Sequence, residues 1–208
     1  MDPIGDAAAA ALRGALIVFP TDTVYGIATT PRDPAATARL FDAKRRPRDL
    51  TLPVLTATVE QARELATFDR RADLLAGSMW PGALTLVLPR AEASRSWQLG
   101  DHGATIGLRV PRHPMAFSLL SAAGPLAATS ANRSGEPPAR TCDELHAAFG
   151  AQVSVYLCLD EPLSGAASAV VDLTQGEARL LRGGAQDVNR IAEMLGGEGS
   201  LLDSRAPG

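Results

Sequence analysis

The sequence contains few of the side chains that bind metals or form nucleophile sites. Its 208 residues include three histidines, far apart along the chain, and two cysteines, Cys142 and Cys158, which form no C-x-x-C pair. The H-E-x-x-H, G-x-S-x-G and G-x-x-x-x-G-K-[ST] motifs are absent, which argues against a zinc protease, an α/β-hydrolase and a P-loop. We therefore expect no metal held by the protein itself, and we expect both cysteines to be reduced.

Long apolar runs and a basic N-terminus are also missing. No stretch approaches the roughly 20 apolar residues that cross a bilayer, and the opening MDPIGDAAAA carries acids where a signal peptide has Lys or Arg. These features predict a cytoplasmic protein with no membrane partner. The length and the 46% hydrophobic content fit one globular domain, expected over residues 8–195, followed by a flexible tail over 196–208.

Lysine and aromatic residues are scarce. Only one of the 20 basic residues is a lysine, Lys44. A mutational bias toward arginine codons and a site that requires a compact ammonium group explain this equally well. The net charge of −3 gives no overall attraction to nucleic acid, and an aromatic content of 4% argues against base stacking.

The pattern of apolar residues predicts interspersed strands and helices, with several strands in succession near the C-terminus. We expect strands over residues 15–19, 51–56, 85–89, 105–111, 126–129, 153–158, 168–173 and 178–182. We expect helices over residues 7–13, 34–44, 58–66, 70–79, 114–121, 141–149 and 187–195. This order favours an α/β (α+β-like) domain with a mixed sheet over a doubly wound fold.

Three loops carry hydroxyl, amide or basic groups in place of simple turn residues. The loop PTDTVYG, residues 20–26, is either a binding loop for a small polar ligand or an ordinary turn with its tyrosine on the core. The run KRRPR, residues 44–48, either stabilises a helix C-terminus or presents Lys44 and Arg46 to a polyphosphate. The turn Ser130-Ala131-Asn132 is either a ligand-binding turn or a polar turn.

Three further polar residues lie at or inside predicted strands. Ser168 begins one strand and Arg182 ends another. Arg109 lies inside an alternating strand and is followed by a proline two residues later. Such an arginine either faces a cleft or occupies an exposed strand position, and we favour the cleft.

Seven motifs follow one another along the chain: PTDTVYG, AKRRP, WPGALTLVL, GLRVPRHP, ATSANRSGEPP, SAVVD and LLRGG. Over about residues 8–195 they resemble the threonylcarbamoyl-AMP synthase (YrdC-type, TsaC-like) family. The resemblance implies an open, twisted mixed sheet with flanking helices and a large, positively lined concave cleft. It also implies a nucleotidyltransferase that condenses L-threonine, bicarbonate and ATP, with Mg²⁺, to threonylcarbamoyl-AMP and pyrophosphate. A separate transferase complex then uses this product to modify tRNA.

The resemblance also assigns roles to residues at the matching motif positions. No residue acts as a nucleophile, and Lys44, Arg46 and Arg109 stabilise charge. The residues implied to bind ATP are Lys44, Arg46, Ser130, Asn132, Thr141, Ser168 and Arg182. Those implied to bind threonine are Thr23, Arg109, Ser130 and Ser168. The PPART stretch can be aligned with either Arg140 or Thr141 in the nucleotide position.

Two positions depart from the family pattern. Leu55 occupies the place where many members have a histidine that contacts threonine, and Gly183 stands where proline is common. The alternative function is a non-catalytic paralogue that uses the same cleft to bind RNA or a nucleotide, including direct contact with tRNA.

Overall fold

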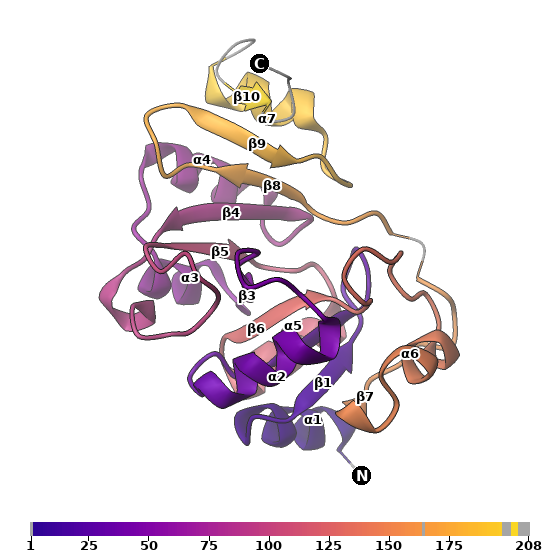
Figure 1. Ribbon diagram of the computed structural model, residues 1–208. Helices are drawn as coiled ribbons and strands as arrows, with labels where there is room; N and C mark the ends of the chain where they lie inside the picture. The colour runs from indigo at the N-terminus through magenta and orange to yellow at the C-terminus, as the bar shows by residue number, and fades with distance from the viewer. Residues whose placement is uncertain (1, 164, 197–200, 204–208) are drawn as a thin grey trace.

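A single mixed sheet of ten strands runs through the computed structural model, which describes residues 2–163, 165–196 and 201–203 (Figure 1). The strands are β1 (Leu16–Phe19), β2 (Gly26–Thr29), β3 (Val54–Leu55), β4 (Leu84–Pro89), β5 (Thr105–Arg109), β6 (Leu126–Ser130), β7 (Val153–Tyr156), β8 (Ala169–Asp172), β9 (Ala178–Arg182) and β10 (Leu201–Asp203). Their order across the sheet is β10-β9-β8-β4-β5-β3-β6-β2-β1-β7, with parallel and antiparallel neighbours. The predicted α/β fold with an open mixed sheet is confirmed.

Seven α-helices flank this sheet in the described part of the chain. They are α1 (Pro3–Leu12), α2 (Pro34–Lys44), α3 (Val59–Leu65), α4 (Arg70–Met79), α5 (Pro114–Ala123), α6 (Cys142–Phe149) and α7 (Val188–Leu195). Each helix begins after a residue whose side chain accepts a hydrogen bond from a backbone N–H of the first turn, as Asp33 does for α2 and Asp69 for α4. No described helix combines the length and apolar character of a bilayer span.

The helices cover the two faces of the sheet unequally. Alternate residues of each strand point to opposite faces. On one face α2, α3, α4, α6 and α7 bury the larger core, which includes Leu84, Leu86 and Leu88 of β4. On the other face α1 and α5 pack against Ile17 and Phe19 of β1, and against neighbouring residues of β2, β3 and β6. The part of this second face formed by β4, β5 and β8 lines a cleft instead.

Two strands differ from the sequence-based expectation. No strand is predicted over β2, and its first residue, Gly26, belongs to the expected PTDTVYG loop. All four of its residues are buried, and it pairs antiparallel with β1 and β6. β10 lies within the region 196–208 that was expected to be a flexible tail. It pairs parallel with β9, and Leu201 packs against the core; residues 197–200 and 204–208 lie outside the described chain.

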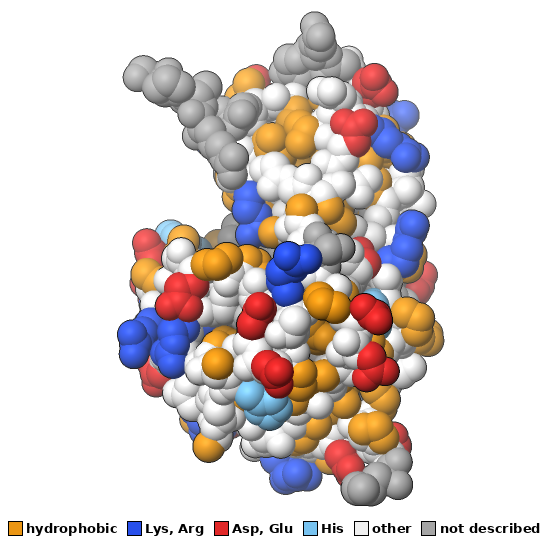
Figure 2. All heavy atoms as spheres, turned by 90° about the vertical axis from the view of Figure 1, so that its right-hand side faces the viewer, with side chains coloured by type: hydrophobic (Ala, Val, Ile, Leu, Met, Phe, Trp, Pro, Cys, Tyr) orange, Lys and Arg blue, Asp and Glu red, His pale blue; other side chains and the backbone are white. Residues whose placement is uncertain are grey.

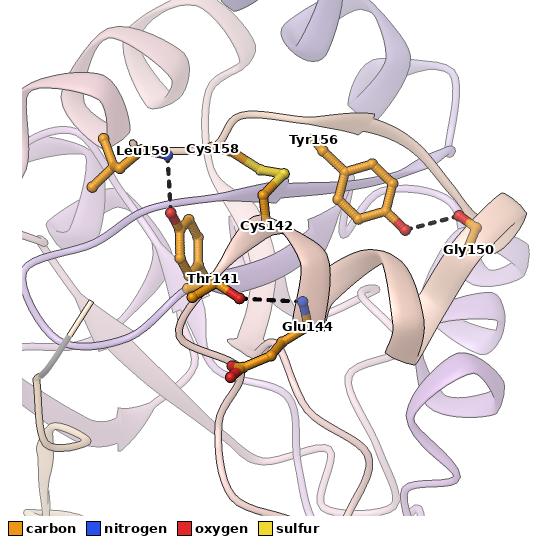
Figure 3. Close-up of a disulfide and its surroundings, with 8 residues drawn as sticks. Thr141, Cys142, Glu144, Gly150, Tyr156, Cys158 and Leu159 are labelled. Atoms are coloured by element: carbon orange, nitrogen blue, oxygen red, sulfur yellow. Dashed lines mark hydrogen bonds between the residues drawn. A yellow bond between two sulfur atoms is a disulfide. The ribbon is translucent and has the colours of Figure 1, made fainter. Parts of the chain in front are cut away.

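The two cysteines form a disulfide, so the expectation that they are reduced was wrong (Figure 3). Cys142 begins α6, and Cys158 follows β7 two residues after its end. The chain turns back between α6 and β7 and brings the two Cα atoms to 5.7 Å, within bridging range. Beside the bridge, the Leu159 amide donates a hydrogen bond of 2.9 Å to the Tyr25 hydroxyl. The disulfide therefore closes a local loop next to the PTDTVYG segment.

We expect the disulfide to stabilise the fold by limiting the freedom of the unfolded chain. The bridged cysteines are 16 residues apart, and a loop of this length is worth about 3 kcal/mol in the chain-entropy model. Urea unfolding should show a loss of about this size when the wild-type protein is reduced with dithiothreitol. The Cys142→Ser, Cys158→Ser double variant is the control, because its unfolding should not respond to the reductant. Equal stability of the oxidised and reduced wild type would contradict this expectation.

Candidate active site

A cleft of about 480 Å³ lies on the part of the sheet face that α1 and α5 leave open. This volume is within the usual range for small-molecule sites. Seen from the side, the outline of the molecule is indented below its C-terminal part (Figure 2). The cleft brings together six of the predicted site residues, which come from β5, β6 and β9 and from three loops: Thr23, Arg46, Arg109, Ser130, Ser168 and Arg182. Lys44, Asn132 and Thr141 are not part of its lining.

Arg109 is buried at the end of β5, and its guanidinium group is held from three sides. Nε donates to the Gly82 carbonyl at 2.9 Å, Nη1 to the Thr23 hydroxyl at 2.9 Å, and Nη2 to the Asp22 carboxylate at 2.6 Å. Burial lowers the pKa of Arg109, and the Asp22 charge opposes that shift. The structure thus fixes Arg109 as a cation facing the cleft.

Asp22 connects three segments that are far apart in the sequence. One of its oxygens, Oδ1, accepts both the Arg109 guanidinium and the backbone N–H of Arg112, the latter at 2.9 Å. Arg112 in turn donates from Nε to the Pro81 carbonyl at 2.9 Å. The sequence-based reasoning missed Asp22, although an acid within a Thr-rich loop and an arginine inside an apolar strand are the signals that could have paired them.

The hydroxyl groups of Thr21 and Thr23 lie next to Arg109. They are 2.9 Å apart, and Thr21 also donates to the Val24 carbonyl at 2.6 Å and accepts the Thr23 N–H at 3.2 Å. Both threonines are almost fully buried by the protein, yet both contribute to the cleft lining. Gly165 lies directly on this loop, because a Cβ atom there would overlap the Thr23 carbonyl oxygen.

Lys44 lies beneath the Ser130–Asn132 turn and not on the cleft wall. Its Nζ donates to the carbonyls of Ser130 and Asn132 at 2.5 Å each. Burial, with a smaller contribution from the charge of Arg46, lowers the pKa of Lys44 from 10.5 to about 7. A neutral amine still has two N–H groups for the two carbonyls, and protonation adds a third donor. Lys44 therefore supports the turn that carries Ser130 into the cleft.

Arg46 and Arg182 line the same cleft and are more exposed than Arg109. Arg46 donates to the carbonyls of Leu50 and Thr51 at 2.7 and 3.2 Å. Arg182 donates to the Ser168 carbonyl and hydroxyl at 3.0 and 3.2 Å. Burial and then the like charge of Arg182 lower the pKa of Arg46. Arg182 also contributes to lowering the pKa of Arg109. The three arginines therefore converge on one cavity, which suits an anion with several charged oxygens.

Two predicted residues have structural contacts away from the cleft lining. The Thr141 hydroxyl accepts the Glu144 N–H and so caps the N-terminus of α6. The Asn132 amide donates to the carbonyls of Arg133 and Glu136, while its buried Oδ1 has no partner among the described residues. That oxygen is the part of Asn132 that could accept a hydrogen bond from a ligand.

The cleft wall beside Arg109 contains Leu55, at the position where the family pattern often has histidine. Leu55 of β3 is in register with Arg109 of the parallel strand β5, so both side chains lie on the same face of the sheet. Leu55 lines the cleft and also packs in the core beneath α1 and α5. It gives the wall beside Arg109 an apolar surface where a histidine would offer a hydrogen bond.

We expect the low pKa of Lys44 to make stability rise with pH above about 7. Between that value and the unperturbed pKa near 10.4, the unfolded chain binds a proton at Lys44 that the folded protein does not. Stability therefore increases with pH in this window, by at most about 1.4 kcal/mol per pH unit, and Lys44 contributes no slope below it. Urea unfolding at pH 7, 8 and 9 should show this rise in the wild type and its loss in Lys44→Met. Parallel pH curves for the two proteins would contradict the assignment.

Comparison with known proteins shows extensive similarity. Residues 9–184 match the Sua5/YciO/YrdC family model, described as "Telomere recombination". A Mycobacterium leprae protein is 44% identical over 194 residues, which cover 93% of this chain and 88% of the relative. A Chromohalobacter salexigens protein named threonylcarbamoyl-AMP synthase is 38% identical over 180 residues, covering 85% of this chain and 95% of the relative.

Two solved structures share the fold. Pyrococcus abyssi Sua5, complexed with L-threonine, superposes with a TM-score of 0.85 at 33% identity, covering 96% of this chain. This chain spans only 58% of the length of that Sua5 chain. Escherichia coli YciO superposes with a TM-score of 0.82 at 26% identity, covering 90% of this chain and 92% of YciO.

Proposed function

This chain belongs to the Sua5/YciO/YrdC family, and we propose that it is an L-threonylcarbamoyladenylate synthase, a nucleotidyltransferase. It would condense L-threonine, bicarbonate and ATP to threonylcarbamoyl-AMP and pyrophosphate. The observation that carries this proposal is the convergence of Arg46, Arg109 and Arg182 on one cleft that also exposes threonine and serine hydroxyls. The names of the relatives favour this synthase over a non-catalytic RNA-binding paralogue.

The arrangement suits a reaction that needs no protein nucleophile. Bicarbonate gives CO₂ by losing hydroxide. The ammonium group of threonine loses one proton, and the free amine adds to the carbon of CO₂ and loses a second proton, which gives a carbamate; one of these protons and the hydroxide form water. A carbamate oxygen then attacks the α-phosphorus of ATP, the bond from that phosphorus to the bridging oxygen of the β-phosphate breaks, and pyrophosphate leaves. Both steps join reactants and redistribute negative charge, so positioning and fixed cations supply the catalysis.

The two ends of the cleft would bind different parts of the reactants. Arg46 and Arg182 would bind the phosphates, and Lys44, beneath the Ser130–Asn132 turn, would contribute its third N–H when it is protonated. Arg109 and Thr23 would bind the amino acid. Ser130 and Ser168, which line the cleft, would complete the junction between the two substrates. Asn132 and Thr141 lie outside that lining and stay predicted nucleotide ligands.

We also propose that Mg²⁺ enters with ATP. Two carboxylates, those of Asp49 and Asp172, are part of the cleft lining, and Mg²⁺ typically binds to substrate phosphates with one or two carboxylates and retained water. These side chains therefore fit a metal that is held mainly by the nucleotide. When bound, Mg²⁺ would supply charge compensation on the phosphates. The threonylcarbamoyl product would then pass to a transferase that modifies tRNA.

The proposal is tested by incubating the protein with ATP, Mg²⁺, L-threonine and ¹⁴C-bicarbonate, and measuring pyrophosphate and the labelled adenylate. Wild type should release pyrophosphate only when threonine is present. Arg46→Gln and Arg182→Gln should each lower kcat/KM by about 100-fold, as expected when a preorganised donor to a developing charge is removed. Arg70→Gln is the matched control, because Arg70 is exposed on α4, which packs on the other face of the sheet. Failure of the wild type to release threonine-dependent pyrophosphate would refute the function.

A further inference from the structure

The hydroxyl groups of Thr21 and Thr23 form a hydrogen-bond chain whose direction is fixed. A hydroxyl has one hydrogen to donate and two lone pairs that accept. Thr21 donates its hydrogen to the Val24 carbonyl, which can only accept. The contact of 2.9 Å between the two hydroxyls must therefore use the hydrogen of Thr23. With the Thr23 N–H also bound to it, the Thr21 hydroxyl has no remaining donor or acceptor.

The other side of the Thr23 hydroxyl is fixed by Arg109. Arg109 Nη1 donates to Thr23 Oγ1 at 2.9 Å, and a guanidinium group cannot accept. Rotation of the Thr23 hydroxyl toward Arg109 would place two donors against each other. Arg109 is itself held by the Gly82 carbonyl and by Asp22, so it cannot move away without losing these bonds. Thr23 has therefore used its hydrogen and one lone pair, and one lone pair remains.

We propose that Thr21 is a positioning residue that turns Thr23 into a hydrogen-bond acceptor for the α-amino group of the amino-acid substrate. This inference rests on the proposed synthase function. Thr23 lines the cleft, and its remaining lone pair can receive only an N–H or O–H donor. Beside it, each terminal nitrogen of Arg109 carries two N–H groups, of which Nη1 uses one for Thr23 and Nη2 uses one for Asp22.

An α-amino acid matches this pair of neighbouring groups. It carries a cationic donor and an anionic acceptor on one carbon, so its amine fits the Thr23 oxygen and its carboxylate fits the Arg109 N–H groups. A carboxylate placed against Thr23 would face a lone pair and be repelled. An amine whose N–H is held by Thr23 has its lone pair, after deprotonation, directed away from that oxygen. The carbon of CO₂ would add on that free side.

The first test compares two substitutions at Thr21 by calorimetric binding of L-threonine and by steady-state kinetics. Thr21→Val removes the acceptor that holds the Thr23 hydrogen, while Thr21→Ser keeps it. Thr21→Val should raise the Kd and KM for threonine by about 10- to 100-fold, the usual effect of losing a hydrogen bond to a charged group. The KM for ATP should stay within about 2-fold. Thr21→Ser should restore threonine binding to within about 2-fold of wild type.

The second test identifies the substrate group that Thr23 binds, and it does not depend on the folding of Thr21→Val. Wild type and Thr23→Val are compared with L-threonine and with L-2-aminobutyrate, which lacks the side-chain hydroxyl. If the amine donates to Thr23, the substitution weakens both ligands by the same factor. A loss confined to threonine would show that the side-chain hydroxyl is the donor and would overturn the assignment.

Two other outcomes separate this inference from the proposed function. A Thr21→Val protein with the wild-type melting temperature and unchanged threonine binding would overturn the role of Thr21 alone. A wild-type protein that binds threonine but releases no pyrophosphate would refute the synthase function, while the binding comparisons would still decide how the amino acid is held.

Discussion

The buried ion pair between Asp22 and Arg109 joins the loops from which the cleft is built. Charges removed from water are costly unless their hydrogen bonds are complete. Here Asp22 also accepts the Arg112 amide, and Arg109 also donates to Gly82 and Thr23. Removing one partner of a buried pair typically costs about 3–5 kcal/mol, because the other charge stays buried. The PTDT, WPG and RVPR segments are therefore held as one unit, which gives a physical reason for their joint occurrence in the sequence.

The cleft exists because helices cover one face of the sheet and only part of the other. Successive side chains of β4 and β5 point to opposite faces of the sheet. One set packs in the main core, and the other set faces the cleft. Thr85 is a polar residue on the face of the sheet that lines the cleft. At Gly107, on the same face, a Cβ atom would lie 3.4 Å from side-chain atoms of Pro53 and Thr85. A larger residue at 107 would therefore fill space in the floor of the cleft. The same strands thus specify a core and a binding surface.

The sequence predicted those helices and strands whose position depends on nearby residues, such as the spacing of apolar side chains and the prolines. The helices over 34–44 and 70–79 were predicted with the observed bounds, because apolar residues recur at helical spacing in the first and Pro81 limits the second. β2 was missed because its burial comes from strands on both sides and not from its own alternation. The pairing of Asp22 with Arg109 joins residues 87 positions apart. The disulfide and the position of Lys44 beneath a turn likewise depend on tertiary contacts that spacing does not reveal.

The basic groups in and beneath the cleft repel one another, and the protein limits this repulsion in two ways. Beside Thr23, the Asp22 carboxylate opposes the burial effect that lowers the pKa of Arg109. Beneath the Ser130–Asn132 turn, the pKa of Lys44 falls to about 7, so this amine is largely neutral at slightly alkaline pH. The Arg182 charge affects two other arginines of the cleft, because it contributes to lowering the pKa of Arg46 and of Arg109. A polyphosphate beside Arg182 would remove repulsion that also reaches Arg109. In the proposed synthase reaction, the charge of a bound nucleotide would thus affect Arg109 through one guanidinium group, that of Arg182.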